Sequence, residues 1–282
     1  MQDAPRKRLT AATHEQEPAT SDSLRRRVLE RETLFGTFMF SASPFLSEVV
    51  AKAGLDWVLV DLEHGTADEP DLLPMFLAIE NAGCTPLVRI ESGARIRAGR
   101  ALDRGARGVM VPQVGSADEA RALARWMRTQ PAGERGIAMY TRGMRYGVGG
   151  DESAAGMHEE LLAMVQIESR PGLEQVEEIA AVEGVDMLFV GPSDLSHALG
   201  IPGQLEHPDF RAALDRVTAA ALAQSKAAGI LVSNMEDVGG YVAKGFTFFS
   251  IATEANILGA ATRESLRTAR AAVAGANTPE VV

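Results

Sequence analysis

Two carboxylates lie where short apolar runs of the chain end. Glu168 closes the run Val165-Gln166-Ile167, and Asp194 follows the run that ends at Val190. Paired carboxylate oxygens are hard ligands that suit Mg²⁺ or Mn²⁺, with Co²⁺ also compatible, and water or substrate completes the coordination. Taken singly, either side chain could instead cap a helix or pair with an arginine. Because both close apolar runs, we predict that Glu168 and Asp194 bind a divalent metal.

A histidine follows another apolar run, in the segment Asp61-Leu62-Glu63-His64. A lone histidine is usually a surface residue or a satisfied core residue. Here the imidazole comes three positions after Asp61, and an adjacent carboxylate can fix the imidazole tautomer as general acid–base catalysis requires. We therefore interpret His64 as a base and Asp61 as its partner.

Arg89 ends the apolar segment Pro86-Leu87-Val88. A cation in such a place is costly without an anionic partner. It could form a structural ion pair, with Asp103 as a candidate, or it could bind a carboxylate or a developing enolate oxygen. Its place at the end of an apolar run favours the second role.

Composition narrows the class of protein. The net charge of −10 gives no electrostatic support for nucleic-acid binding. The single cysteine, Cys84, excludes an internal disulfide framework. No apolar run approaches the roughly 20 residues of a membrane span, and the N-terminal residues do not resemble a secretory leader. We expect a cytoplasmic protein that acts on small molecules without membrane contact.

The four lysines bear on mechanism. None of them follows an apolar run, whereas an aldolase that forms a Schiff base needs a lysine in the active site. They are Lys7, Lys52, Lys226 and Lys244. Imine chemistry is therefore disfavoured, and a metal is expected to provide the electrophile.

Eight apolar runs recur along the chain and predict how these residues are positioned. Their apolar character is nearly continuous, as in parallel strands covered on both faces. They span residues 34–40, 57–63, 85–90, 108–114, 162–168, 186–191, 229–233 and 246–253. Amphipathic stretches separate most of them, at residues 44–53, 70–82, 94–104, 117–128, 173–182, 210–228 and 238–244.

Repeated strand–helix units predict an α/β fold of the (β/α)8 TIM-barrel type. A doubly wound open sheet is the alternative, but no Gly-x-Gly-x-x-Gly turn follows the first run. In a TIM barrel the active site lies at the carboxyl ends of the strands. The residues that close the runs are therefore expected at one rim.

The remaining segments complete the predicted organisation. Residues 1–22 are polar and aperiodic, which predicts a disordered tail, and residues 23–282 are expected to form a single barrel domain. The long stretch 131–159 interrupts the rhythm and is interpreted as a functional loop. Residues 255–274 predict a C-terminal helix available for oligomer contacts.

Several segments resemble the HpcH/HpaI aldolase family. The similarity runs from about residue 36 to the last predicted strand. It rests on residues 36–38, 56–65, 86–89, 108–112, 133–136, 165–168 and 191–196, among which D-x-E-H and G-P-x-D-L-S are specific. The resemblance implies a metal-dependent class II aldolase that cleaves a 4-hydroxy-2-oxo acid or a 2-keto-3-deoxy sugar acid to pyruvate and an aldehyde. It also implies a homo-oligomer, either a trimer or a hexamer.

The resemblance assigns roles residue by residue. It implies metal binding by Glu168 and Asp194, a base formed by His64 with Asp61, and stabilisation of the pyruvate enolate by Arg89. It further implies substrate contacts from Gln166, Ser193 and Arg142, and an acid, Asp103, near the aldehyde and contributed across a subunit contact. One departure is Ala252-Thr253-Glu254, where the family often has Gly-x-Asp.

Two other functions stay open at this point. A decarboxylase of oxaloacetate-like acids would need the same enolate stabilisation without an acceptor aldehyde. A barrel that binds a small acid without catalysis is the second alternative.

Overall fold

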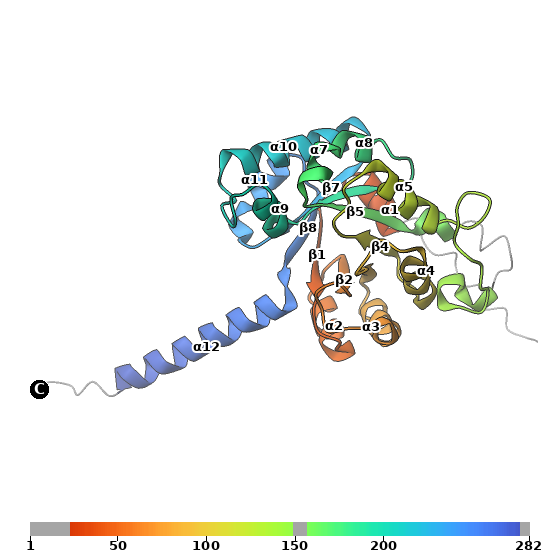
Figure 1. Cartoon of the computed structure of the whole chain (residues 1–282). Helices are drawn as coiled ribbons and strands as arrows, with labels where there is room; N and C mark the ends of the chain where they lie inside the picture. Colours follow the sequence, from red (N-terminus) through yellow and green to blue (C-terminus); the bar gives the residue numbers. More distant parts are fainter. Residues whose placement is uncertain (1–22, 149–156, 277–282) are drawn as a thin grey trace, which may run out of the picture.

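The computed structural model describes residues 23–148 and 157–276. Eight parallel strands close into a barrel in the order of the sequence, and β1 pairs with β8 (Figure 1). The strands are β1 (Leu34–Met39), β2 (Trp57–Asp61), β3 (Thr85–Arg89), β4 (Gly108–Val111), β5 (Leu162–Ile167), β6 (Met187–Val190), β7 (Ala227–Val232) and β8 (Phe248–Thr253). The predicted (β/α)8 barrel with a C-terminal helix is confirmed.

The strands are buried on both faces, which explains their continuous apolar character. One set of side chains packs between the strands and the surrounding helices. The other set fills the barrel interior, where the Trp57 ring stacks on Phe248 with centroids 4.3 Å apart and Phe38 contacts Phe189 at 5.8 Å. A filled interior makes the barrel a rigid support for its upper rim.

The helices begin where the sequence supplies caps. Ser43, Ser116 and Ser169 accept hydrogen bonds from first-turn N–H groups of the helices that follow them. The α-helices are α1 (Leu24–Leu29), α2 (Pro44–Ala51), α3 (Glu69–Asn81), α4 (Arg95–Arg104), α5 (Ala117–Trp126), α7 (Arg170–Glu174), α8 (Val176–Ala180), α9 (Pro192–Ala198), α10 (Pro208–Ala223), α11 (Val238–Ala243) and α12 (Glu254–Ala276). Short 3-10 helices are η1 (Arg142–Gly147), η2 (Met157–Glu160) and η3 (Met235–Asp237).

Three helical segments differ from the prediction. The stretch 173–182 is divided because Gln175 has non-helical torsions of φ −107 and ψ 19. The predicted helix over 210–228 ends at Ala223, since Ser225 is left-handed (φ 54) and β7 begins at Ala227. Helix α9 was not predicted, because seven residues are too few to show a helical period.

Helix α12 leaves the barrel instead of packing along it (Figure 1). Its apolar side chains Ile257, Leu258, Leu266 and Val273 are exposed in this chain. The predicted disordered tail, residues 1–22, lies outside the described residues. In the part of the chain that is described, no helix has the length and apolar character needed to cross a membrane.

Candidate active site

A pocket of about 520 Å³ opens at the carboxyl ends of the strands. Polar side chains from β3, β5 and α9 line it together with apolar side chains. Its lining consists of Phe38, Phe40, His64, Arg89, Gln166, Phe189, Gly191, Pro192, Ser193, Asp194, Gly203, Leu205, Leu231 and Ser233. The predicted rim residues His64, Arg89, Gln166, Ser193 and Asp194 therefore meet at one pocket.

Asp61 and Arg89 form a buried ion pair at the base of this pocket. The Arg89 Nε and Nη2 atoms donate to the two Asp61 carboxylate oxygens at 2.8 and 2.6 Å. Asp61 is 0% exposed, and its Cα is directly opposite that of Arg89 in the pairing of β2 with β3. This bidentate contact orients the guanidinium and offsets the cost of burying it.

The predicted pairing of Asp61 with His64 is wrong. Both Asp61 oxygens are held by Arg89, and the chain bends away from β2 after Asp61. The His64 side chain is 58% exposed, and its Nε2 atom lies 3.9 Å from Glu63 Oε2. A spacing of three residues brings side chains together on a helix, but His64 follows the end of a strand.

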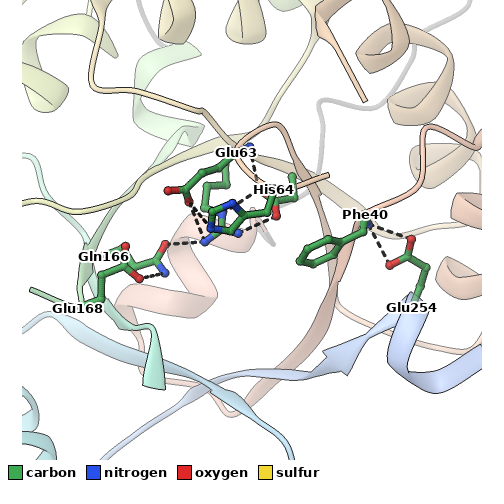
Figure 2. Close-up of polar contacts among 8 residues, drawn as sticks. Phe40, Glu63, His64, Gln166, Glu168 and Glu254 are labelled. Atoms are coloured by element: carbon green, nitrogen blue, oxygen red, sulfur yellow. Dashed lines mark hydrogen bonds and ion pairs between the residues drawn. The ribbon is translucent and has the colours of Figure 1, made fainter. Parts of the chain in front are cut away.

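Glu63 links this histidine to the arginine. Its Oε2 atom lies 3.0 Å from Arg89 Nη1 as well as 3.9 Å from the imidazole. Burial raises the pKa of Glu63, while Arg89 and His64 lower it. The imidazole thus has a carboxylate neighbour, but from the residue next to it in the chain (Figure 2).

Gln166 and Glu168 form a second polar group on β5 and just beyond it. Gln166 Nε2 donates to Glu168 Oε2, and the Gln166 carbonyl oxygen Oε1 accepts from Arg89 Nη1 at 3.4 Å (Figure 2). The Gln113 backbone N–H donates to Glu168 Oε1 at 2.9 Å. A Cβ on Gly191 would lie 2.2 Å from Glu168 Oε2, so a larger residue there would displace this carboxylate.

Glu168 and Asp194 have the chemistry that suits a divalent cation. Burial raises the pKa of Glu168 to about 7; the Asp194 charge adds to the rise, while the Gln113 N–H and Arg89 oppose it. A cation between the two carboxylates would relieve this unfavourable concentration of negative charge. Among residues 23–148 and 157–276, no three His, Cys, Asp or Glu side chains form a metal cage. Water and substrate would therefore supply the other ligands.

The pocket lining also includes apolar side chains. Phe40, Leu205 and Leu231 line it together with Phe38, whose ring lies 5.2 Å from the Arg89 guanidinium carbon. The pocket thus combines charged groups suited to an acid group with apolar side chains suited to a hydrocarbon surface.

Asp103 and Arg142 do not lie at this rim within one chain. Asp103, near the end of α4, accepts from Arg135 Nη2 at 3.2 Å. Arg142 pairs with Glu80 and covers Gly105, which connects α4 to the start of β4. Arg142 is thus near the amino ends of the strands, and its predicted substrate contact is not formed within the chain. The prediction that Asp103 serves a neighbouring subunit stays a prediction.

The sequence placed Glu63 and Gln113 at strand ends without indicating a specific role for either, and it did not identify Phe40. Glu63 and Gln113 both follow strands, so their place in the chain was a usable signal. Phe40 gave no signal, because an aromatic residue after an apolar strand is indistinguishable from core. Lys52, Lys226 and Lys244 do not line the pocket, and Lys7 lies outside the described residues.

The family profile described as HpcH/HpaI aldolase/citrate lyase matches residues 34–260, which is most of the chain. The chain belongs to the HpcH/HpaI aldolase/citrate lyase family. The match begins at the first residue of β1 and includes the first residues of α12.

Two proteins named as aldolases are similar to this chain over most of its length. It is 37% identical to the hydroxypyruvate/pyruvate aldolase of Paraburkholderia phytofirmans, over 89% of this chain and 98% of that protein. It is 36% identical to the 2-dehydro-3,6-dideoxy-6-sulfogluconate aldolase of Pseudomonas putida, over 90% and 98%.

A solved structure of a family member agrees with the fold. The crystal structure of an HpcH/HpaI aldolase/citrate lyase family protein from Burkholderia cenocepacia J2315 superposes with a TM-score of 0.83 at 34% identity. The superposition covers 88% of this chain and 99% of that one.

Proposed function

We propose that this chain is a metal-dependent pyruvate aldolase. It would reversibly cleave a 4-hydroxy-2-oxo acid or a 2-keto-3-deoxy sugar acid to pyruvate and an aldehyde. The observation that carries the proposal is one pocket lined by Arg89, Gln166 and Asp194, with the buried carboxylate of Glu168 bound to Gln166 next to it. The names of the similar aldolases support the same reaction class.

Glu168 and Asp194 would hold Mg²⁺ or Mn²⁺, with Co²⁺ also compatible. Such an ion supplies Lewis-acid stabilisation of negative charge on the oxygens of a 2-oxo acid. Arg89, already fixed by Asp61, would face the same oxygens and stabilise charge that develops there. Gln166, held between Arg89 and Glu168, and Ser193 at the start of α9 would orient the bound acid.

His64 would move the proton. It lines the pocket and is exposed enough to exchange protons with water. In the synthetic direction its imidazole would take a proton from C3 of pyruvate, directly or through a water. In cleavage it would take the C4 hydroxyl proton as the C3–C4 bond breaks, leaving the aldehyde and the pyruvate enolate. Glu63 would stabilise the protonated imidazole.

We also propose that the protein is a cytoplasmic homo-oligomer, a trimer or a hexamer, in which α12 packs against a neighbouring copy. The exposed apolar residues of α12 support this proposal, since a long helix with an uncovered apolar stripe needs a partner. An assembly would also allow Asp103 to reach the aldehyde side of a neighbouring pocket.

The test is proton exchange of pyruvate in D₂O, which needs no knowledge of the aldehyde. Chelator-treated protein supplied with Mn²⁺ should replace the methyl protons of pyruvate with deuterium. Glu168→Gln and Asp194→Asn should each slow exchange by at least about 100-fold, because Lewis-acid stabilisation contributes several kcal/mol and about 1.4 kcal/mol is tenfold. Exchange that continues unchanged in either variant contradicts the metal assignment.

His64→Ala separates aldol cleavage from decarboxylation of oxaloacetate. Decarboxylation releases CO₂ and needs no base at C3, so it should survive in this variant. Aldol cleavage and pyruvate exchange should fall by about 100-fold or more, the usual contribution of a general base.

A further inference from the structure

Glu254, the first residue of α12, is buried against the segment that follows β1. It is 6% exposed. Its two carboxylate oxygens accept from the Phe40 N–H at 2.9 Å (Figure 2). Its Oε1 atom also accepts from the Ser41 N–H at 2.6 Å. Backbone N–H groups bound by a buried carboxylate are held more firmly than by a neutral acceptor.

The end of β8 adopts an unusual conformation that brings Glu254 to this place. The register between β1 and β8 shifts after Gly36, so that Phe38 is opposite Thr253. Ala252 has a left-handed backbone (φ 60), which L side chains rarely adopt. Its carbonyl accepts from Thr37 Oγ1 at 3.1 Å and Ser250 Oγ at 3.0 Å. Strain of this kind persists only where surrounding contacts maintain it.

Phe40 connects this buried contact to the pocket. Its backbone N–H faces Glu254, whereas its ring points toward the His64 side (Figure 2). With Leu205 and Leu231, which also line the pocket, the ring gives an apolar surface on the side of His64, the residue that would take the C4 hydroxyl proton. The aldehyde portion of a substrate would therefore lie against Phe40.

We propose that Glu254 is a positioning residue that holds Phe40 as the apolar wall of the aldehyde subsite. The inference rests on the proposed aldolase function and deepens it, because it selects aldehydes that carry an alkyl chain over polyhydroxylated ones. Glu254 also begins α12, so the attachment of this helix and the shape of the subsite depend on one side chain.

The experiment compares aldol addition of pyruvate to butanal and to glyceraldehyde with Mn²⁺ present. The wild-type protein should favour butanal by at least about tenfold in kcat/KM, a typical discrimination by an apolar pocket. Glu254→Gln retains the size of the side chain but presents an amide donor toward one backbone N–H. It should raise the KM for butanal about fivefold, a loss of about 1 kcal/mol of binding, and reduce the preference for butanal. Pyruvate exchange without aldehyde should change by less than about twofold.

Two controls test whether Glu254 alters the aldehyde preference by positioning Phe40. Glu264→Gln changes an exposed glutamate on the same helix, paired with Arg267, and should alter neither readout. Phe40→Ala should abolish the preference for butanal, and adding Glu254→Gln to it should cause no further loss. If Glu254→Gln does not fold, Glu254→Asp, which withdraws the carboxylate by one methylene, is measured in the same way.

Three results would overturn the proposal. They are a wild-type protein without preference for butanal, additive effects in the double variant, and equal losses of pyruvate exchange and aldol addition in Glu254→Gln. Failure of the proposed function gives a different result, because the wild-type protein would then not exchange the protons of pyruvate at all.

Discussion

Glu168 illustrates how burial and a neighbouring charge prepare one side chain for metal binding. It is 2% exposed, and the charge of Asp194 acts on it as a like charge. Both effects favour the protonated form, so that its pKa rises from 4.5 to about 7. A cation and a proton therefore compete for this carboxylate near neutral pH.

The raised pKa of Glu168 predicts that the stability of the metal-free protein depends on pH. Folded Glu168 keeps a proton that the unfolded chain releases, so its stabilising contribution is full below about pH 4.5 and is lost as the pH rises through about 7. In chelated samples, the thermal midpoint of the wild type relative to Glu168→Gln should therefore fall between about pH 5 and about pH 8. If the difference in thermal midpoint between the wild type and Glu168→Gln does not change with pH, the raised pKa of Glu168 is contradicted. Mn²⁺ should raise the wild-type midpoint more at the higher pH.

At the scale of elements, close packing between strands decides which residues the barrel tolerates. Gly36 on β1 lies against Trp57 on β2, and a Cβ there would be 2.1 Å from the indole ring and 2.3 Å from the Trp57 carbonyl oxygen. Trp57 is 0% exposed and stacks on Phe248, so it has no space into which to move. Glycine is required here for space rather than for an unusual backbone.

Gly36→Ala should lower the free energy of unfolding by about 3 kcal/mol, the upper part of the usual cost of overpacking a core. The matched control is Gly99→Ala within α4, where an added Cβ meets nothing within 4 Å. That substitution should stabilise the protein by about 0.5 to 1 kcal/mol, since alanine is the better helix former. Urea denaturation of both variants measures the two changes in the free energy of unfolding. Equal changes would show that Trp57 can move to make room for the added Cβ.

At the scale of the whole molecule, helix α12 leaves apolar side chains exposed that the rest of the described chain does not cover. It runs from Glu254 to Ala276 and extends away from the barrel (Figure 1). Its first residue, Glu254, binds the backbone of Phe40 just after β1. The barrel is complete without the rest of the helix, because β8 already closes onto β1. The distal part of α12 is thus available for assembly, whereas its first residues belong to the barrel.

Deletion of residues 258–282 should therefore disrupt the oligomer and leave a folded barrel. Light scattering should show a lower mass than for the full chain, and pyruvate exchange should persist because the polar part of the pocket lies within one chain. Aldol addition should fall if Asp103 acts from a neighbouring copy. A deletion ending the chain at residue 276 is the control, and an unchanged mass after the longer deletion would contradict the role of α12.

The strands and most helices were predictable from the sequence, because continuous apolar runs and helical periods are local properties. The boundaries of β1, β2 and β3 agree with the predicted runs within two residues. Helices α7, α8 and α9 were not predictable as separate helices, since each is too short to show a repeated helical period. The C-terminal helix was found because its pattern extends over many turns.

The sequence by itself determined which polar residues reach the rim, since a strand end places its side chain there in any (β/α)8 barrel. Only the tertiary structure decided which of them pair. Asp61 binds Arg89 because β2 and β3 align the two residues, and His64 meets Glu63 because the chain turns after the strand. Glu254 contacts Phe40 across a barrel closure that joins the two ends of the sequence. Pairing depends on strand register and on the direction of turns, and neither is encoded in the local spacing of residues.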